Sequence, residues 1–170
     1  MQRKPARLAS QDLTILALDI SLSATGWAIV KVTGGLTTLV CCNEIKTNAK
    51  QTHGQRLRVI RKTLETIHKS NPFDILVREK GFSRFPRETQ ALFKVHGVAE
   101  EYFTDFKVQE YAPATIKKVI AGTGKASKDE VEAGVRRILD LPEEFIFVSD
   151  NASDAVAVAL TYIIEKGGIK

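Results

Sequence analysis

The sequence predicts an α/β domain, with a mixed five-stranded sheet in which three antiparallel strands come first and parallel strands follow, flanked by helices. Two patterns predict this class. Three β-rich segments occur in succession near the start of the chain, and Thr33-Gly34-Gly35 between two of them is a hairpin turn. Beyond them, segments with apolar residues three or four positions apart, typical of one-faced helices, alternate with short apolar runs of strand length.

Five segments are expected to form the strands. A short apolar run that ends in an acid opens the series, and two β-rich segments follow on either side of the hairpin turn. A fourth run is apolar enough to be central in the sheet, and the fifth is short. The ranges are Thr14–Ile20, Thr25–Lys31, Leu36–Ile45, Asp74–Arg78 and Lys107–Tyr111.

Helix boundaries follow from periodicity and from end signals. Pro113 suits the first position of a helix that Gly122 ends, and Ser127 with Glu130 forms the capping-box pattern that opens the next helix. A short apolar connection precedes the last helix. The order of elements matches the mixed sheet of RNase H-like proteins, although a fold alone does not fix function. The expected helices are His53–Lys69, Pro86–Phe103, Pro113–Ala121, 128 to about 139, and Ala152–Glu165.

Composition favours one globular domain. The 170 residues are 44% apolar and 26% charged, and residues 13–170 are expected to form a single RNase H-like domain after a flexible basic tail at 1–12. No run approaches a membrane span, so no membrane partner is expected.

Cys41 and Cys42 are neighbours on a strand, point to opposite faces and are not expected to pair. This favours a reduced, cytoplasmic protein, and a DNA substrate would associate it with the nucleoid.

Three acids stand where charge is costly unless it is paired or binds a metal. Asp19 and Glu79 each end an apolar strand, and Asp154 lies in the first part of the last helix, four residues after Asp150. Carboxylates on separate elements suit Mg²⁺, which takes oxygen ligands and keeps several waters. Taken singly, a strand-terminal Asp often caps a loop, and the helix dipole favours an Asp in a first turn. The net charge of +5 is compatible with a polyanionic partner but is weak support alone.

Five collinear motifs between about residues 14 and 165 resemble RuvC Holliday-junction resolvases. The first is Leu16-Ala17-Leu18-Asp19-Ile20-Ser21 with Ala24-Thr25-Gly26-Trp27-Ala28. Ile75–Glu79 with Phe82 resembles the second acidic strand of the family, and Ala91–Ala99 resembles the helix that follows. Glu110 to Lys128 resembles the stretch that carries two basic active-site residues, and Asp154–Ala159 resembles the C-terminal acidic helix.

The resemblance implies roles for particular residues. Asp19, Glu79 and Asp154 match three of the four catalytic acids of the family, and the fourth falls on Asn151. Either Asn151 binds the metal through its carbonyl oxygen, or the neighbouring Asp150 substitutes. Lys117 and Lys128 match the basic pair expected to hold the scissile phosphate. The implied cofactor is Mg²⁺, with Mn²⁺ able to replace it, and the implied assembly is a homodimer that makes two symmetric cuts in a four-way junction.

A second group of residues is expected to contact DNA. Phe82, Arg84, Phe85 and Arg87 lie in one short segment, where interleaved aromatic and basic side chains suit stacking and phosphate contact. The resemblance implies that Phe82 wedges against bases at the junction. Lys125 lies in a glycine-rich turn at a helix start, where backbone N–H groups attract anions. Solvent-exposed loop aromatics and an ordinary surface lysine are the alternatives.

The function that these observations predict is a structure-specific endonuclease, possessing a two-metal site, that resolves Holliday junctions or other branched DNA. The motifs have diverged in the manner of a phage or mobile-element branch. One alternative within the fold is a less selective fork or flap nuclease, or a ribonuclease H. The other is a branched-DNA-binding protein without catalysis, which the Asn151 substitution keeps open.

Overall fold

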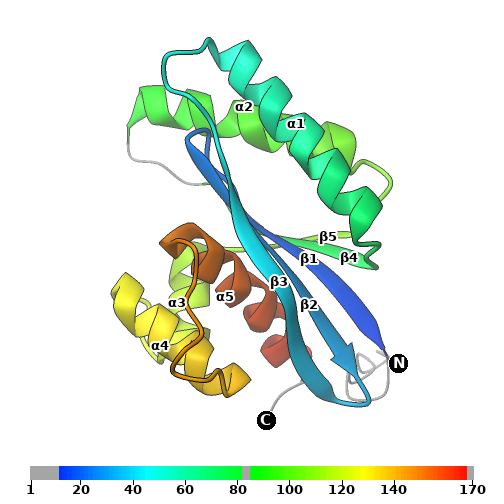
Figure 1. The fold of residues 1–170 in the computed structure, drawn as a ribbon. Helices are drawn as coiled ribbons and strands as arrows, with labels where there is room; N and C mark the ends of the chain where they lie inside the picture. Colours follow the sequence, from blue (N-terminus) through cyan, green and yellow to red (C-terminus); the bar gives the residue numbers. More distant parts are fainter. Residues whose placement is uncertain (1–11, 82–84, 168–170) are drawn as a thin grey trace, which may run out of the picture.

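The five strands form one mixed sheet in the order β3-β2-β1-β4-β5, as Figure 1 shows. The computed structural model describes residues 12–81 and 85–167. β2 pairs antiparallel with both β1 and β3, whereas β4 runs parallel to β1 and β5 parallel to β4. The predicted mixed sheet is therefore confirmed. The strands are β1 (Leu13–Asp19), β2 (Ala24–Thr33), β3 (Leu36–Lys46), β4 (Ile75–Glu79) and β5 (Val108–Tyr111).

Helices cover both faces of the sheet. In Figure 1, α1 and α2 lie on one face, and α3, α4 and α5 lie on the other. α5 begins two residues earlier than predicted, because the Ser149 hydroxyl accepts the Ala152 N–H and caps the helix. The predicted capping box of Ser127 and Glu130 is confirmed. The helices are α1 (His53–Ser70), α2 (Pro86–Tyr102), α3 (Pro113–Ala121), α4 (Lys128–Leu139) and α5 (Asp150–Glu165).

Successive side chains of each strand point to opposite faces of the sheet, and this divides the hydrophobic core into two parts. In β1, Ile15 and Ala17 pack towards α3, α4 and α5, whereas Leu16 and Leu18 pack towards α1 and α2. α5 is buried almost throughout, from Ala155 to Ile163, because it lies across the middle of the sheet. The same alternation separates the two cysteines: Cys42 packs on the α5 side and Cys41 on the opposite side, and both are free. The expectation that they do not pair is confirmed.

A hairpin turn and a bulge fix the register of β3 against β2. Gly34 and Gly35 have φ angles of 57° and 85°, which a two-residue hairpin turn requires. From that turn Thr33 pairs with Leu36, but the register shifts by one residue between Val30 and Ile29. A β-bulge of this kind moves every later side chain of β3 to the other face.

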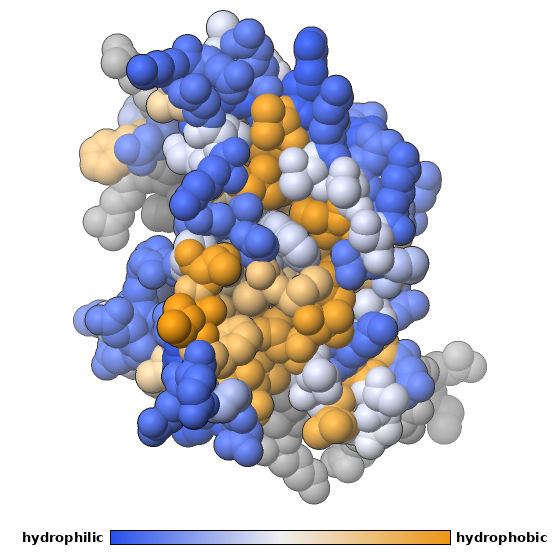
Figure 2. Space-filling view, in the orientation of Figure 1, coloured by the Kyte–Doolittle hydropathy of each residue, from blue (hydrophilic) through white to orange (hydrophobic). Residues whose placement is uncertain are grey.

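The surface and the N-terminal segment complete the fold. Figure 2 shows apolar surface over the middle of one face, and the exposed apolar side chains include Leu36 and Val40 of β3 and Ile146 and Val148 between α4 and α5.

Of the predicted 1–12 tail only Asp12 is described, and its carboxylate accepts the Gly34 N–H at 3.1 Å; the rest lies outside the described residues. Among the described helices, none has the length and apolar character to cross a membrane.

Candidate active site

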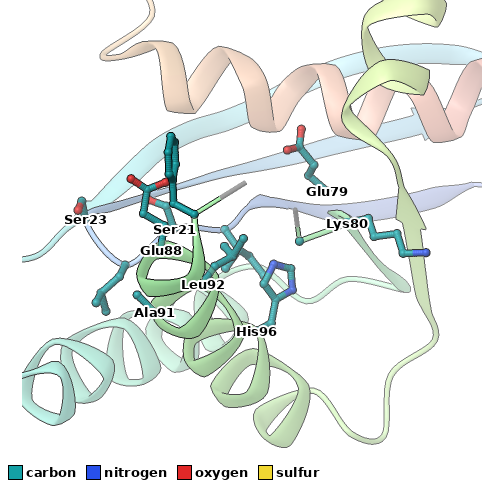
Figure 3. A pocket seen from close by; sticks show the side chains of 12 residues that line it. Ser21, Ser23, Glu79, Lys80, Glu88, Ala91, Leu92 and His96 are labelled. Atoms are coloured by element: carbon teal, nitrogen blue, oxygen red, sulfur yellow. The ribbon is translucent and has the colours of Figure 1, made fainter. Parts of the chain in front are cut away.

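Asp19 and Glu79 lie side by side at the ends of two parallel strands. Leu18 of β1 pairs with Arg78 of β4, so the next residue of each strand is one of the two acids. Two residues earlier on the same side of each strand, Ala17 and Val77 belong to the core beneath α5. Both acids therefore face the α5 side, and Figure 3 shows the Glu79 carboxylate pointing to that side, away from His96.

The third predicted acid reaches the same place from α5. Asp154 lies one turn into the helix that Ser149 caps. It lines a pocket of about 260 Å³ together with Asp19, Glu79, Lys117 and Lys128. The structure thus brings together five of the predicted catalytic residues from five separate elements.

Burial and mutual repulsion alter the acidity of these carboxyl groups. Burial, with the charge of Asp154 in addition, raises the pKa of Asp19 to about 6. Burial and then the charges of Asp19 and Asp154 raise the pKa of Glu79 to about 8. Burial also raises the pKa of Asp154, although the nearby Lys128 opposes that rise. Groups that repel one another in a pocket are typical of functional sites.

Lys128 supplies positive charge at this pocket. It is the first residue of α4, and its Nζ lies 3.2 Å from Oδ2 of Asp154 and 3.8 Å from Oδ2 of Asp150. Lys117 projects from α3 into the lining of the same pocket, and its charge lowers the pKa of Glu79. The two predicted lysines therefore flank the acids, from two helices that meet the pocket on the same side of the sheet.

The donor set suits a hard divalent cation. The three carboxyl groups, each with a raised pKa, provide oxygen ligands, and a cation would stabilise their ionised forms. In residues 12–81 and 85–167, however, no three His, Cys, Asp or Glu side chains converge closely enough to hold an ion as they stand. In this arrangement the Asp154 carboxylate is paired with the ammonium of Lys128. The carboxylate chemistry of the three residues nevertheless fits a hard divalent cation.

The two candidates for the fourth ligand do not line this pocket, although Asp150 adjoins it through Lys128. The Asn151 side chain donates from Nδ2 to Oε2 of Glu44 at 3.0 Å, and the Asp150 side chain is 71% exposed. Neither residue lines the pocket of the three acids. Glu44 on β3 was not anticipated from the sequence. Its one signal was a position two residues after Cys42, on the same side of a predicted strand.

The predicted DNA contacts are described only in part. Phe82 and Arg84 lie outside the described residues, and Arg87 is in the first turn of α2. Phe85 precedes Pro86, is 63% exposed and lines a second pocket of about 540 Å³, between the β1–β2 loop and α2 (Figure 3). Glu79 lines both pockets, so this hollow adjoins the acids. Lys125 is exposed and is not part of the acidic pocket.

Comparison with known proteins identifies the family of this chain. A family model described as crossover junction endodeoxyribonuclease RuvC matches residues 15–162. The chain belongs to the RuvC family. The RuvC of Prochlorococcus marinus is 34% identical over 157 residues, which cover 91% of this chain and 99% of the relative. The RuvC of Ehrlichia canis is 35% identical over 157 residues, covering 91% and 98%.

Solved structures of RuvC-family and other resolvases show the same fold. A structure titled Thermus thermophilus RuvC matches with a TM-score of 0.71 at 26% identity, covering 93% of this chain and 99% of that one. A T. thermophilus RuvC in complex with Holliday junction substrate has a TM-score of 0.79 at 22% identity, covering 93% and 98%. The yeast mitochondrial resolvase Ydc2, at 11% identity and a TM-score of 0.67, covers 91% and 79% and shares the fold. The predicted RNase H-like architecture is therefore confirmed.

Proposed function

We propose that this chain is an endonuclease that resolves Holliday junctions by metal-dependent hydrolysis of phosphodiester bonds. One observation carries the proposal: three carboxyl groups with raised pKa values and two lysines converge in a single pocket. The names of the relatives support it, because they are crossover junction endodeoxyribonucleases, and one similar structure holds a Holliday junction substrate.

Asp19, Glu79 and Asp154 would hold Mg²⁺, with Mn²⁺ as a substitute. When bound at such carboxylates, paired ions activate the attacking water and stabilise charge on the leaving oxygen. One P–O bond forms to the water oxygen and one breaks to the leaving sugar oxygen. The three acids would bind the ions and orient the phosphate, and a bound cation would favour the ionised form of Glu79, whose pKa is raised to about 8 without metal.

Lys117 and Lys128 would act on the phosphate. Both ammonium groups border the acidic pocket, so a phosphate that enters it meets them as well as the acids. A phosphoryl group gains negative charge on its oxygens during hydrolysis, and fixed positive charge stabilises that state more than the ground state. The contact of Lys128 with Asp154 holds its ammonium in place before the substrate arrives.

The pocket beside the acids would receive the DNA branch point. It is bounded by the β1–β2 loop and α2, and its lining includes the exposed ring of Phe85. Phe82, Arg84, Arg87 and Lys125 are proposed to contact the same DNA. A homodimer would place two such pockets on one four-way junction, because a two-fold axis relates the paired cuts. Sedimentation of the protein with and without junction DNA tests that assembly.

A panel of substrates tests the function directly. Purified protein with Mg²⁺ is assayed on a four-way junction, a fork, a flap, linear duplex and an RNA–DNA hybrid of matched sequence, with Asp19→Asn as the control. Symmetric paired cuts in the junction alone are the expected result. Comparable cutting of forks and flaps would favour the less selective nuclease, and junction binding without cutting would favour the non-catalytic alternative.

A further inference from the structure

Glu44 and Asp19 lie in one row across the sheet. Asp19 pairs with Gly26 of β2, and Gly26 pairs with Glu44 of β3. Residues paired across antiparallel strands point to the same face, so both acids face the helices of the α5 side. Gly26 separates them and contributes no side chain.

The first turn of α5 occupies the space above Gly26. A Cβ placed on Gly26 would overlap the main-chain carbonyl of Asn151. Gly26 therefore lets the helix backbone rest directly on β2. Asn151 thus lies between Asp19 and Glu44, with its backbone against the strand.

Glu44 binds the first turn of α5 from β3, on the side of Gly26 opposite Asp19. Its Oε2 accepts the Asn151 amide at 3.0 Å, and its Oε1 lies 2.8 Å from Nζ of Lys46. The Glu44 side chain is only 7% exposed. Hydrogen bonds from Lys46 and then from Asn151, with a further one from the Ser149 cap, keep its pKa below the usual range. An ionised carboxylate also suits a helix N-terminus.

We propose that Glu44 is a positioning residue, which binds the Asn151 amide and so fixes the first turn of α5 where Asp154 meets Asp19 and Glu79. The inference rests on the proposed nuclease function and deepens it. Asn151 and Asp154 are three residues apart, so a shift of the first turn moves both. Asn151 is then a docking group that has no part in binding the metal.

The same contact explains why an amide stands at 151. A carboxylate there would face the Glu44 carboxylate at hydrogen-bonding distance, with the donor removed and a like charge added. Reversing the polarity of the pair restores the bond: with Glu44→Gln, an amide on β3 can donate to an acid on α5. The effects of substitutions at positions 44 and 151 should therefore be non-additive. Each single variant is compared with the double variant.

The test is a double-mutant cycle of Asn151→Asp, Glu44→Gln and both together, with Asn43→Asp as the matched control. Asn43 is exposed and points to the opposite face of β3, and its Oδ1 accepts the Glu44 N–H at 2.8 Å, a bond that an Asp carboxylate also accepts. It therefore receives the same change of charge without facing the pair. Three properties are measured: melting temperature in EDTA, Mn²⁺ binding without DNA by electron paramagnetic resonance, and the Mg²⁺ dependence of single-turnover cleavage well below the melting temperature.

Asn151→Asp is expected to lower the melting temperature by a few degrees and the maximal cleavage rate about ten-fold. The double variant should recover most of both losses, and the control should resemble wild type. Wild-type behaviour of Asn151→Asp whatever stands at 44 would overturn the proposal. So would abolition of Mn²⁺ binding by Glu44→Gln at an unchanged melting temperature, which would make Glu44 a ligand. If no DNA is cut at all, the proposed function fails, while the coupling in stability and Mn²⁺ binding still decides this inference.

Discussion

The ammonium of Lys128 lies 3.2 Å from the Asp154 carboxylate, so the base at the start of α4 is paired with the acid near the start of α5. Replacing Lys128 by Ala should lower the single-turnover cleavage rate about a hundred-fold, because the charge that stabilises the transition state is lost. Lys117→Ala should act in the same way. Junction Kd should stay close to wild type for both, and Lys62→Ala, exposed on α1 and outside the pocket, is the control. A loss confined to Kd would reduce the two lysines to ordinary phosphate contacts.

Asp19→Asn, Glu79→Gln and Asp154→Asn should each abolish cleavage, because each change removes one charged ligand from the shared pocket. Junction binding should survive, since phosphate contacts elsewhere supply most of the affinity. Cleavage and gel-shift assays on one junction measure both properties. A variant that cuts at nearly the wild-type rate would remove its residue from the site.

The raised pKa of Glu79 predicts how stability without metal depends on pH. In the unfolded chain this group ionises near 4.5, whereas in the folded protein it keeps its proton up to about 8. Its contribution to stability is therefore complete below about pH 4.5 and is lost as the pH rises through 8. In EDTA, Glu79→Gln should melt several degrees above wild type above pH 8 and equal to it below 4.5, at about 2–4 °C per kcal/mol. Added Mg²⁺ should stabilise wild type more than the variant. Equal melting temperatures across the range would contradict the assignment.

Gly26→Ala should disrupt the packing of α5 on β2, because the new methyl group would meet the Asn151 main chain. We expect a loss of about 1–3 kcal/mol in the free energy of unfolding and a larger proportional loss of cleavage, since Asp154 moves with the helix. Gly97→Ala is the matched control: it lies in α2, and nothing is within 4 Å of its added methyl group. Denaturant unfolding and single-turnover assays compare the two. Equal stability of both variants would mean that α5 is not held against Gly26.

Aromatic stacking at the branch point predicts a dependence on substrate structure. Phe82→Ala and Phe85→Ala should each lose about ten- to a hundred-fold in junction cutting, since stacking on a base is worth about 1–3 kcal/mol. Phe82→Trp and Phe85→Trp should retain most of the rate. A junction with unpaired bases at its centre should restore part of the loss, because the bases are already exposed. Equal loss on intact and pre-opened junctions would indicate that the rings only support the loop.

Much of the site could be read from local patterns. Asp19 and Glu79 end strands whose apolar runs are plain in the sequence, and parallel strands bring their ends together at one edge. The capping box of Ser127 and Glu130 predicts the start of α4 and hence the position of Lys128. These features depend on neighbours in the chain, so the sequence carries them directly.

Glu44 could not be found in this way, and its role was decided by tertiary structure. Counting back from the hairpin turn, where Thr33 pairs with Leu36, would place Asn43 opposite Gly26 and turn Glu44 to the wrong face. The bulge beside Val30 shifts the register by one residue, and only then does Glu44 join the row of Asp19. The sequence by itself determined the strands, the starts of α1 to α4 and the three acids, because propensity, periodicity and capping act over a few residues. The pairing of Asn151 with Glu44 was decided by the bulge and by the missing side chain of Gly26. These two residues are 107 positions apart, so their contact depends on how α5 packs on the folded sheet.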